Sequence, residues 1–227
     1  MGEAAKTSEN KFSIVITGYM DPRLHHPTWY RIIEAINESE QKEALSQNIV
    51  IVPTLSQFNV PEFKVVCTTT TWEISTTEAQ HRPRILQTAK LVFKKLYETP
   101  ASYYGMNTDL ERETARQNIN HDLADMMALT GLGLVGKDYR SASISFSTTD
   151  EPCTTNIEIR ASRHTPSFVF MGQNTQYRLN SPDRLSSPEY FDIGEKLEAH
   201  FDTDYQSALE AMDRIVKGLN DFKGIPS

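Results

Sequence analysis

Cysteine is scarce in this sequence, and its scarcity bears on both the compartment and the way the fold is held together. The 227 residues contain two cysteines, Cys67 and Cys153, whose surroundings match neither a disulfide framework nor a metal-binding spacing. A chain of this length can bury a sizeable core without covalent cross-links. We therefore expect a cytoplasmic protein, in which Cys67 is a small buried side chain.

Long apolar runs and an excess of basic charge are also lacking. No stretch reaches the ~20 apolar residues that span a bilayer, and residues 1–10 lack the apolar core of a signal peptide. We expect residues 1–10 to be disordered and the chain not to associate with a membrane. The 30 acidic residues outnumber the 23 lysines and arginines, which gives a net charge of −7. Because general nucleic-acid binding depends on a basic surface, this charge argues against nucleic acid as a partner.

The clearest pattern is a β-rich stretch that leads into one amphipathic helix. Apolar residues at odd-numbered positions (Phe63, Val65 and Cys67) are followed by apolar residues at even-numbered positions (Trp72 and Ile74). The buried face therefore changes within the four threonines at 68–71, which predicts either a β-bulge or two strands that break there. Further on, apolar positions recur at helical spacing: Ile85, Ala89, Val92 and Leu96. A helix is predicted to begin at about Arg82, with Pro83 in its first turn, and to end before Pro100.

Weaker patterns complete the predicted secondary structure. Strands are predicted at 12–17, 48–52, 142–146, 157–161 and 168–171, and a strand or a helical turn at 197–201. Helices are predicted at 28–38, from a capping box at Thr108 to Gly131, and from another capping box at Thr203 to about Leu219. The proline-bounded residues 53–61 and the aromatic, glycine-containing residues 101–107 are predicted loops.

Together these elements predict an α+β fold. We expect a mainly antiparallel sheet of about six to eight strands, with about four helices packed mostly on one face. Strands follow one another too directly in the second half for a regular parallel α/β fold. We expect residues 11–227 to form a single domain. Both halves of the chain contain an alternating strand and a capped amphipathic helix, so residues 11–130 and 138–222 are candidate pseudo-repeated halves.

A glycine-rich stretch offers one candidate phosphate site, made of Gly131, Gly133, Gly136 and Lys137. Its spacing matches a phosphate-binding loop up to the last position, where a Ser or Thr hydroxyl is needed and Asp138 stands instead. A phosphate loop also needs a strand before it and a helix after it, whereas the predicted order here is the reverse. We interpret the stretch as a helix terminus and turn, with nucleotide or phosphate binding as a lesser alternative, and we expect no cofactor.

A second candidate site is a metal site at His200, Asp202 and Asp204, whose period-two spacing would place all three on one side of an extended chain. The favourable position of acidic residues at a helix N-terminus explains the two aspartates equally well. No G-x-S-x-G motif is present. An enzyme with a dispersed site, assembled from Asp21, His25, His200 and Asp202, remains an alternative.

The third candidate is an interface formed by Tyr103, Tyr104, Met106 and Asn107, because tyrosine buries a large area and keeps a polar tip. Local packing at the end of the preceding helix is the competing interpretation. We favour a non-catalytic cytoplasmic binding or assembly subunit that contacts another protein or a second copy of itself. No family resemblance supports this choice, and it follows from an ordered core that lacks a recognisable reactive motif.

Overall fold

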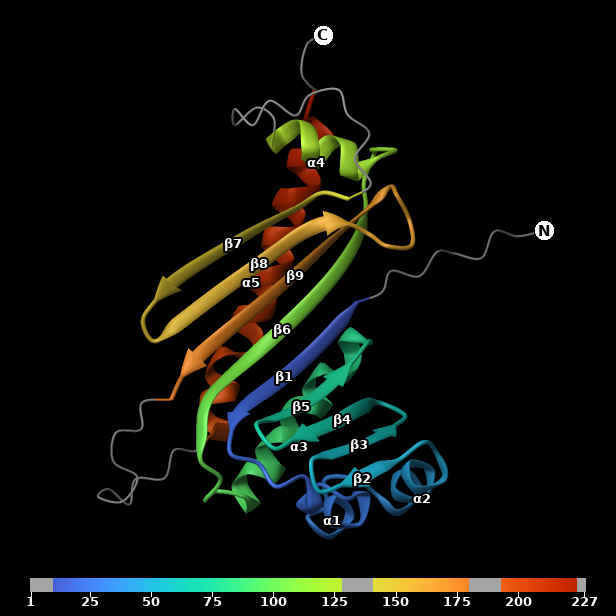
Figure 1. Ribbon diagram of the computed structural model, residues 1–227, viewed down its shortest axis with the longest axis vertical. Coiled ribbons are helices and arrows are strands. Elements are labelled where there is room, and N and C mark those ends of the chain that lie inside the picture. Colours follow the sequence, from blue (N-terminus) through green and yellow to red (C-terminus); the bar gives the residue numbers. More distant parts are fainter. Residues whose placement is uncertain (1–9, 128–140, 180–192, 224–227) are drawn as a thin grey trace, which may run out of the picture.

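The computed structural model describes residues 10–127, 141–179 and 193–223 (Figure 1). The first part contains β1 (Lys11–Gly18), η1 (Pro22–Leu24), α1 (Pro27–Ile32), α2 (Glu38–Ser46), β2 (Val50–Val52), β3 (Leu55–Val60), β4 (Phe63–Thr68), β5 (Thr71–Thr76), η2 (Ala79–His81), α3 (Arg82–Lys95), β6 (Ala101–Glu113) and α4 (Ile119–Met127). The remaining parts contain β7 (Ser143–Asp150), β8 (Cys153–Ala161), β9 (Phe168–Arg178) and α5 (Ile193–Asp221).

One antiparallel sheet organises the molecule, with the strand order β2-β3-β4-β5-β1-β6-β9-β8-β7. Its two central strands, β1 and β6, pair with each other along almost the whole of β1. Figure 1 shows the sheet in front and the long helices α3 and α5 behind it. The predicted α+β fold with a mainly antiparallel sheet is therefore confirmed, and the described residues form nine strands and five α-helices.

Alternating apolar residues build the face of the sheet that the helices cover. Ile14 and Ile16 of β1 and Trp72 and Ile74 of β5 are fully buried beneath α3. The indole ring of Trp72 packs edge-on against Phe93 of α3, with 5.0 Å between the ring centroids. Burial of such large side chains contributes about 1.5–3 kcal/mol each. The parity change predicted within the threonines is a break between two strands, because β4 ends at Thr68 and β5 begins at Thr71.

Helix α3 begins at Arg82 with Pro83 in its first turn, as predicted. The prediction of one helix over residues 28–38 is wrong in extent, since α1 is a single short helix and α2 follows at Glu38. The predicted loop at residues 53–61 contains β3, whose Phe58 and Val60 are buried. Its two flanking prolines mark the ends of a short strand, which pairs with β4 and β2.

Strand β6 corrects two predictions at once. Residues 101–107 are not a loop, and Thr108 does not open a helix, because thirteen residues from Ala101 form one strand. Both edges of β6 are hydrogen-bonded, to β1 on one side and to β9 on the other. This two-sided pairing outweighs the turn-forming tendency of Gly105 and Asn107.

Helix α5 also differs from the prediction, which placed a strand or a helical turn at residues 197–201 and a separate capped helix after it. Its 29 residues run without a break through residues 197–201 and through the expected cap at Thr203. Residues of α5 pack on β6, β9 and α3. The guanidinium of Arg82 in α3 lies over the ring of Tyr205, 3.5 Å from its centroid, and links the two helices. Within the described residues, no helix combines the length and the apolar character that a membrane span requires.

The topology contains an internal repeat. A central strand, one or more helices, a three-stranded meander and a long helix occur first from β1 to α3 and again from β6 to α5, and the first unit has β2 as an additional strand before its meander. The meanders β3-β4-β5 and β7-β8-β9 lie at corresponding places on the two sides of the central pair β1 and β6. The units run Lys11–Lys95 and Ala101–Asp221, so β6 belongs with the second unit. The halves expected from the sequence, 11–130 and 138–222, divide the chain at a later point, and a common origin stays a prediction.

Candidate functional site on the open face of the sheet

The face of the sheet opposite α3 and α5, here called the open face, carries a continuous polar row. Cross-strand pairing places eight polar residues side by side across eight strands, from β3 to β7. In sheet order they are Asn59, Lys64, Ser75, Ser13, Asn107, Asn174, Asn156 and Ser147. Antiparallel sheets commonly leave one face to solvent, so polarity alone is not a site.

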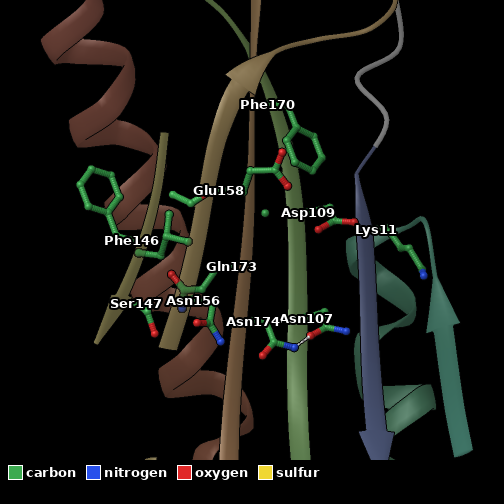
Figure 2. A pocket seen from close by; sticks show the side chains of 13 residues that line it. Lys11, Asn107, Asp109, Phe146, Ser147, Asn156, Glu158, Phe170, Gln173 and Asn174 are labelled. Carbon is green, nitrogen blue, oxygen red and sulfur yellow. Dashed lines mark hydrogen bonds between the residues drawn. The ribbon is translucent and has the colours of Figure 1, made fainter. Parts of the chain in front are cut away.

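The centre of this row is hydrogen-bonded from strand to strand. The amide of Asn107 donates to the Ser13 hydroxyl oxygen across 3.2 Å. The amide of Asn174 donates in turn to the side-chain oxygen of Asn107. Each amide therefore fixes the orientation of its neighbour, and Figure 2 shows the two asparagines side by side on adjacent strands. The row presents amide groups to solvent in a defined direction.

A cavity of about 530 Å³ lies beside the polar row, over β6, β9, β8 and β7. Its lining includes Asn107, Asn156, Asn174, Asp109, Glu158 and Phe170. Gly172 of β9 forms part of the lining, paired with Asp109 on one side and with Glu158 on the other. Figure 2 shows Asp109, Glu158 and Phe170 close together on neighbouring strands of the sheet. The site thus combines carboxylates, amides and aromatic residues, since Phe146 also belongs to the lining.

The surroundings of Asp109 disfavour its negative charge. Burial raises the pKa of its carboxyl, although the charges of Lys11 and Arg160 act in the opposite direction. Lys11 forms its own ion pair with Glu73, at 2.7 Å between nitrogen and oxygen. Within the described residues, the Asp109 carboxylate has no hydrogen bond and no ion pair within 4.0 Å. A half-buried carboxylate in that position is costly unless a cation accompanies it.

The four residues predicted as an interface point to two different faces of the sheet, because successive side chains of a strand alternate between its faces. Tyr103 and Asn107 point to the open face, whereas Tyr104 and Met106 are buried on the face that the helices cover. The Tyr104 ring stacks on Tyr177 of β9, with 4.9 Å between their centroids. The four residues therefore do not form one contiguous surface. Only the open-face pair is placed to contact a partner, and its role in an interface stays a prediction.

The three predicted metal ligands lie in α5, not in an extended strand, so their period-two spacing does not align them. Asp202 lies 3.6 Å from Arg82 and is exposed. His200 instead stacks on the ring of Tyr177, and Asp204 accepts a hydrogen bond from the hydroxyl of Tyr177 across 2.8 Å. Among the described residues no group of three His, Cys, Asp or Glu side chains could hold a metal ion.

The residues of the dispersed-site hypothesis lie in two separate pairs, with Asp21 near His25 and with His200 and Asp202 in α5. His25 packs with Trp29, Tyr30 and Trp72, whereas His200 packs with the tyrosines of β6 and β9. Asp21 pairs with Arg23, its neighbour in the same turn. The structure therefore does not gather these residues into one site. The glycine-rich residues Gly131, Gly133, Gly136 and Lys137 lie outside the described residues.

Strand β7 is the second notable feature of this region. It pairs with β8 along all eight of its residues and forms the last strand of the described sheet. The opposite edge of the sheet is β2, which is three residues long. No known protein-family model matches the sequence, and no curated protein is significantly similar to it. The chemistry of the open face and the exposed edge therefore carries the functional argument.

Proposed function

We propose that this chain is a non-catalytic subunit of a cytoplasmic assembly, and that it acts through protein–protein contacts, first with a second copy of itself. The observation that carries the proposal is the edge strand β7, whose outer side is unpaired in the described part of the chain. A strand edge exposes a row of N–H and C=O groups that can pair with another strand. The free cysteines Cys67 and Cys153 are compatible with a reducing compartment.

Strand β7 lacks the internal charges and prolines that protect many natural edge strands. Its residues from Ser143 to Thr149 include no charge and no proline, and the single charged residue, Asp150, stands at the end. The corresponding strand of the other topological unit is β3, which β2 covers by pairing with it. The second unit has no such covering strand among its described residues. A second copy of β7 would supply it.

The apolar residue Phe146 supports self-pairing in particular. Its side chain is 53% exposed in the single chain, although it lies in the middle of a strand. A two-fold axis perpendicular to the sheet would pair two β7 strands antiparallel and keep both helix layers on the same side. This symmetry keeps each side chain on the same face of the sheet in both copies. A residue can therefore pair only with a residue that points to the same face, so the two residue numbers are both even or both odd.

Two such registers pair seven residues of β7. One places Phe146 opposite Phe146 of the second copy and Ile144 opposite Thr148. The other places Ile144 opposite the charged Asp150. Because an aromatic pair across strands is stabilising and an apolar residue facing a charge is not, the register centred on Phe146 is favoured. The proposal therefore predicts both the partner and the register.

Light scattering after size exclusion tests the assembly. The full chain should elute with a mass of about 52 kDa, twice the 25.8 kDa of one chain. Replacement Phe146→Lys should shift it to a monomer, because two like charges would then face each other. Ser102→Lys, at an exposed position of β6, is the matched control and should stay a dimer. A monomeric wild-type chain at high concentration would contradict the proposal.

Cysteine cross-linking tests the register in a Cys153→Ser background. Directly opposed residues have Cα atoms about 4.5–5.5 Å apart, within the range of a disulfide. Phe146→Cys should therefore cross-link to itself under mild oxidation. Ser145→Cys would lie diagonally from its counterpart, about 7–8 Å away, and should cross-link poorly. Equal cross-linking of both variants, or of neither in a verified dimer, would reject this register.

A further inference from the structure

The two topological units differ in how helices cover the outermost strand of each meander. In the first unit α2 packs on β3, and Phe58 of β3 is fully buried on the face that the helices cover. In the second unit the corresponding strand is β7, and α4 packs near its start, where the side chain of Asn120 accepts a hydrogen bond from the backbone N–H of Ala142 across 3.1 Å. Figure 1 shows α4 beyond that end of the meander. Among the described residues, no helix takes the place of α2 over the rest of β7.

The part of β7 without a covering helix belongs to the apolar face of the sheet. Ile144 stands in the cross-strand row of the buried Met171. Phe146 and Thr148 follow at intervals of two residues and so point to the same face. Phe146 is 53% exposed, Thr148 is exposed, and Ile157, which pairs with Phe146 on β8, is half-buried. These four residues of β7 and β8 are here called the uncovered face.

The space over the uncovered face has the width of one helix. Helix α5 packs on β6 and β9, and a position above β8 and β7 lies two strands further out. Two strand spacings are about 10 Å, which matches the distance of about 8–10 Å between the axes of packed helices. The flank of α5 on this side includes the small, partly buried Ala211, two turns after the Asp204 that bonds Tyr177 of β9. A helix placed there would pack on both the strands and α5.

The length and the charge of the uncovered face describe its partner further. From Ile144 to Thr148 a strand advances about 14 Å, which equals about nine helical residues. Helix α2, which covers the corresponding strand, has nine residues. Asp150 follows two residues after Thr148 on the same face, Glu151 stands next to it, and the whole chain carries a net charge of −7. A partner helix with basic residues beside its apolar stripe would complement these charges.

From this comparison we infer that a partner protein docks a basic amphipathic α-helix on the uncovered face, in the place that α2 occupies in the first unit. Its apolar residues, spaced by three and four, contact Phe146 and Ile157, and its lysines or arginines lie near Asp150. The uncovered face is present in a single chain, so the inference does not depend on the pairing of β7. In a β7 dimer the two uncovered faces adjoin and bind two such helices.

Fluorescence anisotropy of a labelled synthetic helix, titrated with the full chain, tests the inference. The probe is a peptide of about 14 residues, with leucines at spacings of three and four and lysines on its polar side. One control peptide has the same composition with its leucines distributed around the helix, and a second replaces the lysines with glutamates. The probe should bind about tenfold or more tightly than either control. Equal affinity of the probe and either control, or no binding of the probe, would overturn the inference.

Variants locate the docking surface. Ile157→Asp places a charge in the uncovered face and should weaken binding of the probe by about tenfold or more. Asn156→Asp introduces the same side chain on the opposite, open face of β8 and should leave the affinity unchanged. Thr155→Lys, in the cross-strand row of Thr148, repels the basic probe and serves as a second variant if Ile157→Asp does not fold. Unchanged affinity in a folded variant, verified by thermal unfolding, would exclude this surface.

Light scattering of the same proteins separates this inference from the pairing of β7. A wild-type chain that is monomeric but binds the probe would contradict the β7 dimer and support the docking surface. Ile157 lies on β8 and not at the outer edge of the sheet, so Ile157→Asp should keep the mass of the wild type. A lower mass for Ile157→Asp in the absence of the probe would show that a second copy of the chain covers this face, and would overturn the partner helix.

Discussion

Nδ1 of His25 and the hydroxyl of Tyr30 share a hydrogen bond of 3.0 Å in the buried core. The indole N–H of Trp72 donates to the same hydroxyl oxygen across 2.8 Å. The imidazole of His25 is thus enclosed by aromatic side chains that offer it no negative charge. Burial lowers its pKa to about 4.

This arrangement predicts that acid destabilises the fold before most carboxylates are protonated. In the unfolded chain His25 has the ordinary pKa of about 6.5, so the unfolded state binds a proton that the folded state excludes. The free energy of unfolding should be highest above pH ~6.5 and should fall by about 3 kcal/mol as the pH drops to about 4. Urea unfolding at a series of pH values measures this. His25→Gln should flatten the dependence, whereas His81→Gln should keep it, and identical slopes in all three proteins would refute the assignment.

The Tyr177 hydroxyl is one of the groups that join β9 to α5. Asp204 has one side-chain oxygen bonded to Tyr177, and its other oxygen, Oδ2, is buried without a hydrogen-bond partner among the described residues. Tyr177→Phe keeps the ring stacked on Tyr104 and His200 but leaves the carboxylate unsatisfied. We expect a loss of about 1–3 kcal/mol in chemical denaturation.

The matched variant Asp204→Asn retains an acceptor for the Tyr177 hydroxyl and removes a charge that burial disfavours. Burial raises the pKa of Asp204, so its ionised form costs stability above that pKa. Asp204→Asn should therefore be as stable as the wild type near neutral pH, or more stable. Tyr19→Phe, at a largely exposed position, controls for the loss of a hydroxyl. Equal stability of Tyr177→Phe and Tyr19→Phe would show that the buried hydrogen bond contributes nothing.

Two glycines should respond in opposite directions to alanine. A Cβ atom on Gly18 would lie 2.1 Å from the Pro100 carbonyl oxygen, where the pairing of β1 with β6 shifts register. Because backbone and not a flexible side chain blocks it, Gly18→Ala should cost about 3 kcal/mol. Gly218→Ala meets no atom within 4 Å in the exposed surface of α5 and should stabilise the protein by about 0.5–1 kcal/mol. Thermal unfolding of the two variants distinguishes these effects, and a common sign would contradict the packing described.

Arg82 should not be replaceable by lysine. Its guanidinium lies over the Tyr205 ring and donates to the Phe201 carbonyl oxygen across 3.1 Å. Lysine keeps the charge but has no planar group that can stack on the ring while it donates a hydrogen bond. Arg82→Lys should therefore lower the free energy of unfolding by about 1–2 kcal/mol. Arg214→Lys, at an exposed position of α5, is the control. Equal unfolding midpoints for the two variants would show that the stacking is dispensable.

Sequence patterns predicted the elements whose apolar spacing is regular. The alternation through Trp72 and Ile74 and the helical spacing from Ile85 to Val92 correspond to β5 and α3. The same reasoning failed for a segment whose amino-acid composition is typical of a loop but whose backbone pairs with neighbouring strands. Tyr103 to Asn107 have the composition of a loop but lie in the centre of the sheet, because two neighbouring strands satisfy their backbone groups.

The candidate cavity was missed for a related reason. The helix predicted from Thr108 includes Asp109, and the strand predicted at 168–171 ends before Gly172 and Asn174, which lie in β9. A period-two signal was present in Tyr104, Met106 and Leu110, all of which are buried. That signal would have placed Asp109 on the opposite, open face. It could not have shown which strands stand beside it.

The sequence by itself determined the α+β class, the buried parity of β1 and β5, the start of α3 at Arg82 and the burial of Cys67. Each of these depends on the local periodicity of the backbone, which a few neighbouring residues reveal. Only the tertiary structure decided that Asp109, Gly172 and Glu158 are neighbours and that β7 forms an edge. Strand order depends on pairing between segments far apart in the chain, and residues 109 and 158 come together only because β9 pairs with both β6 and β8.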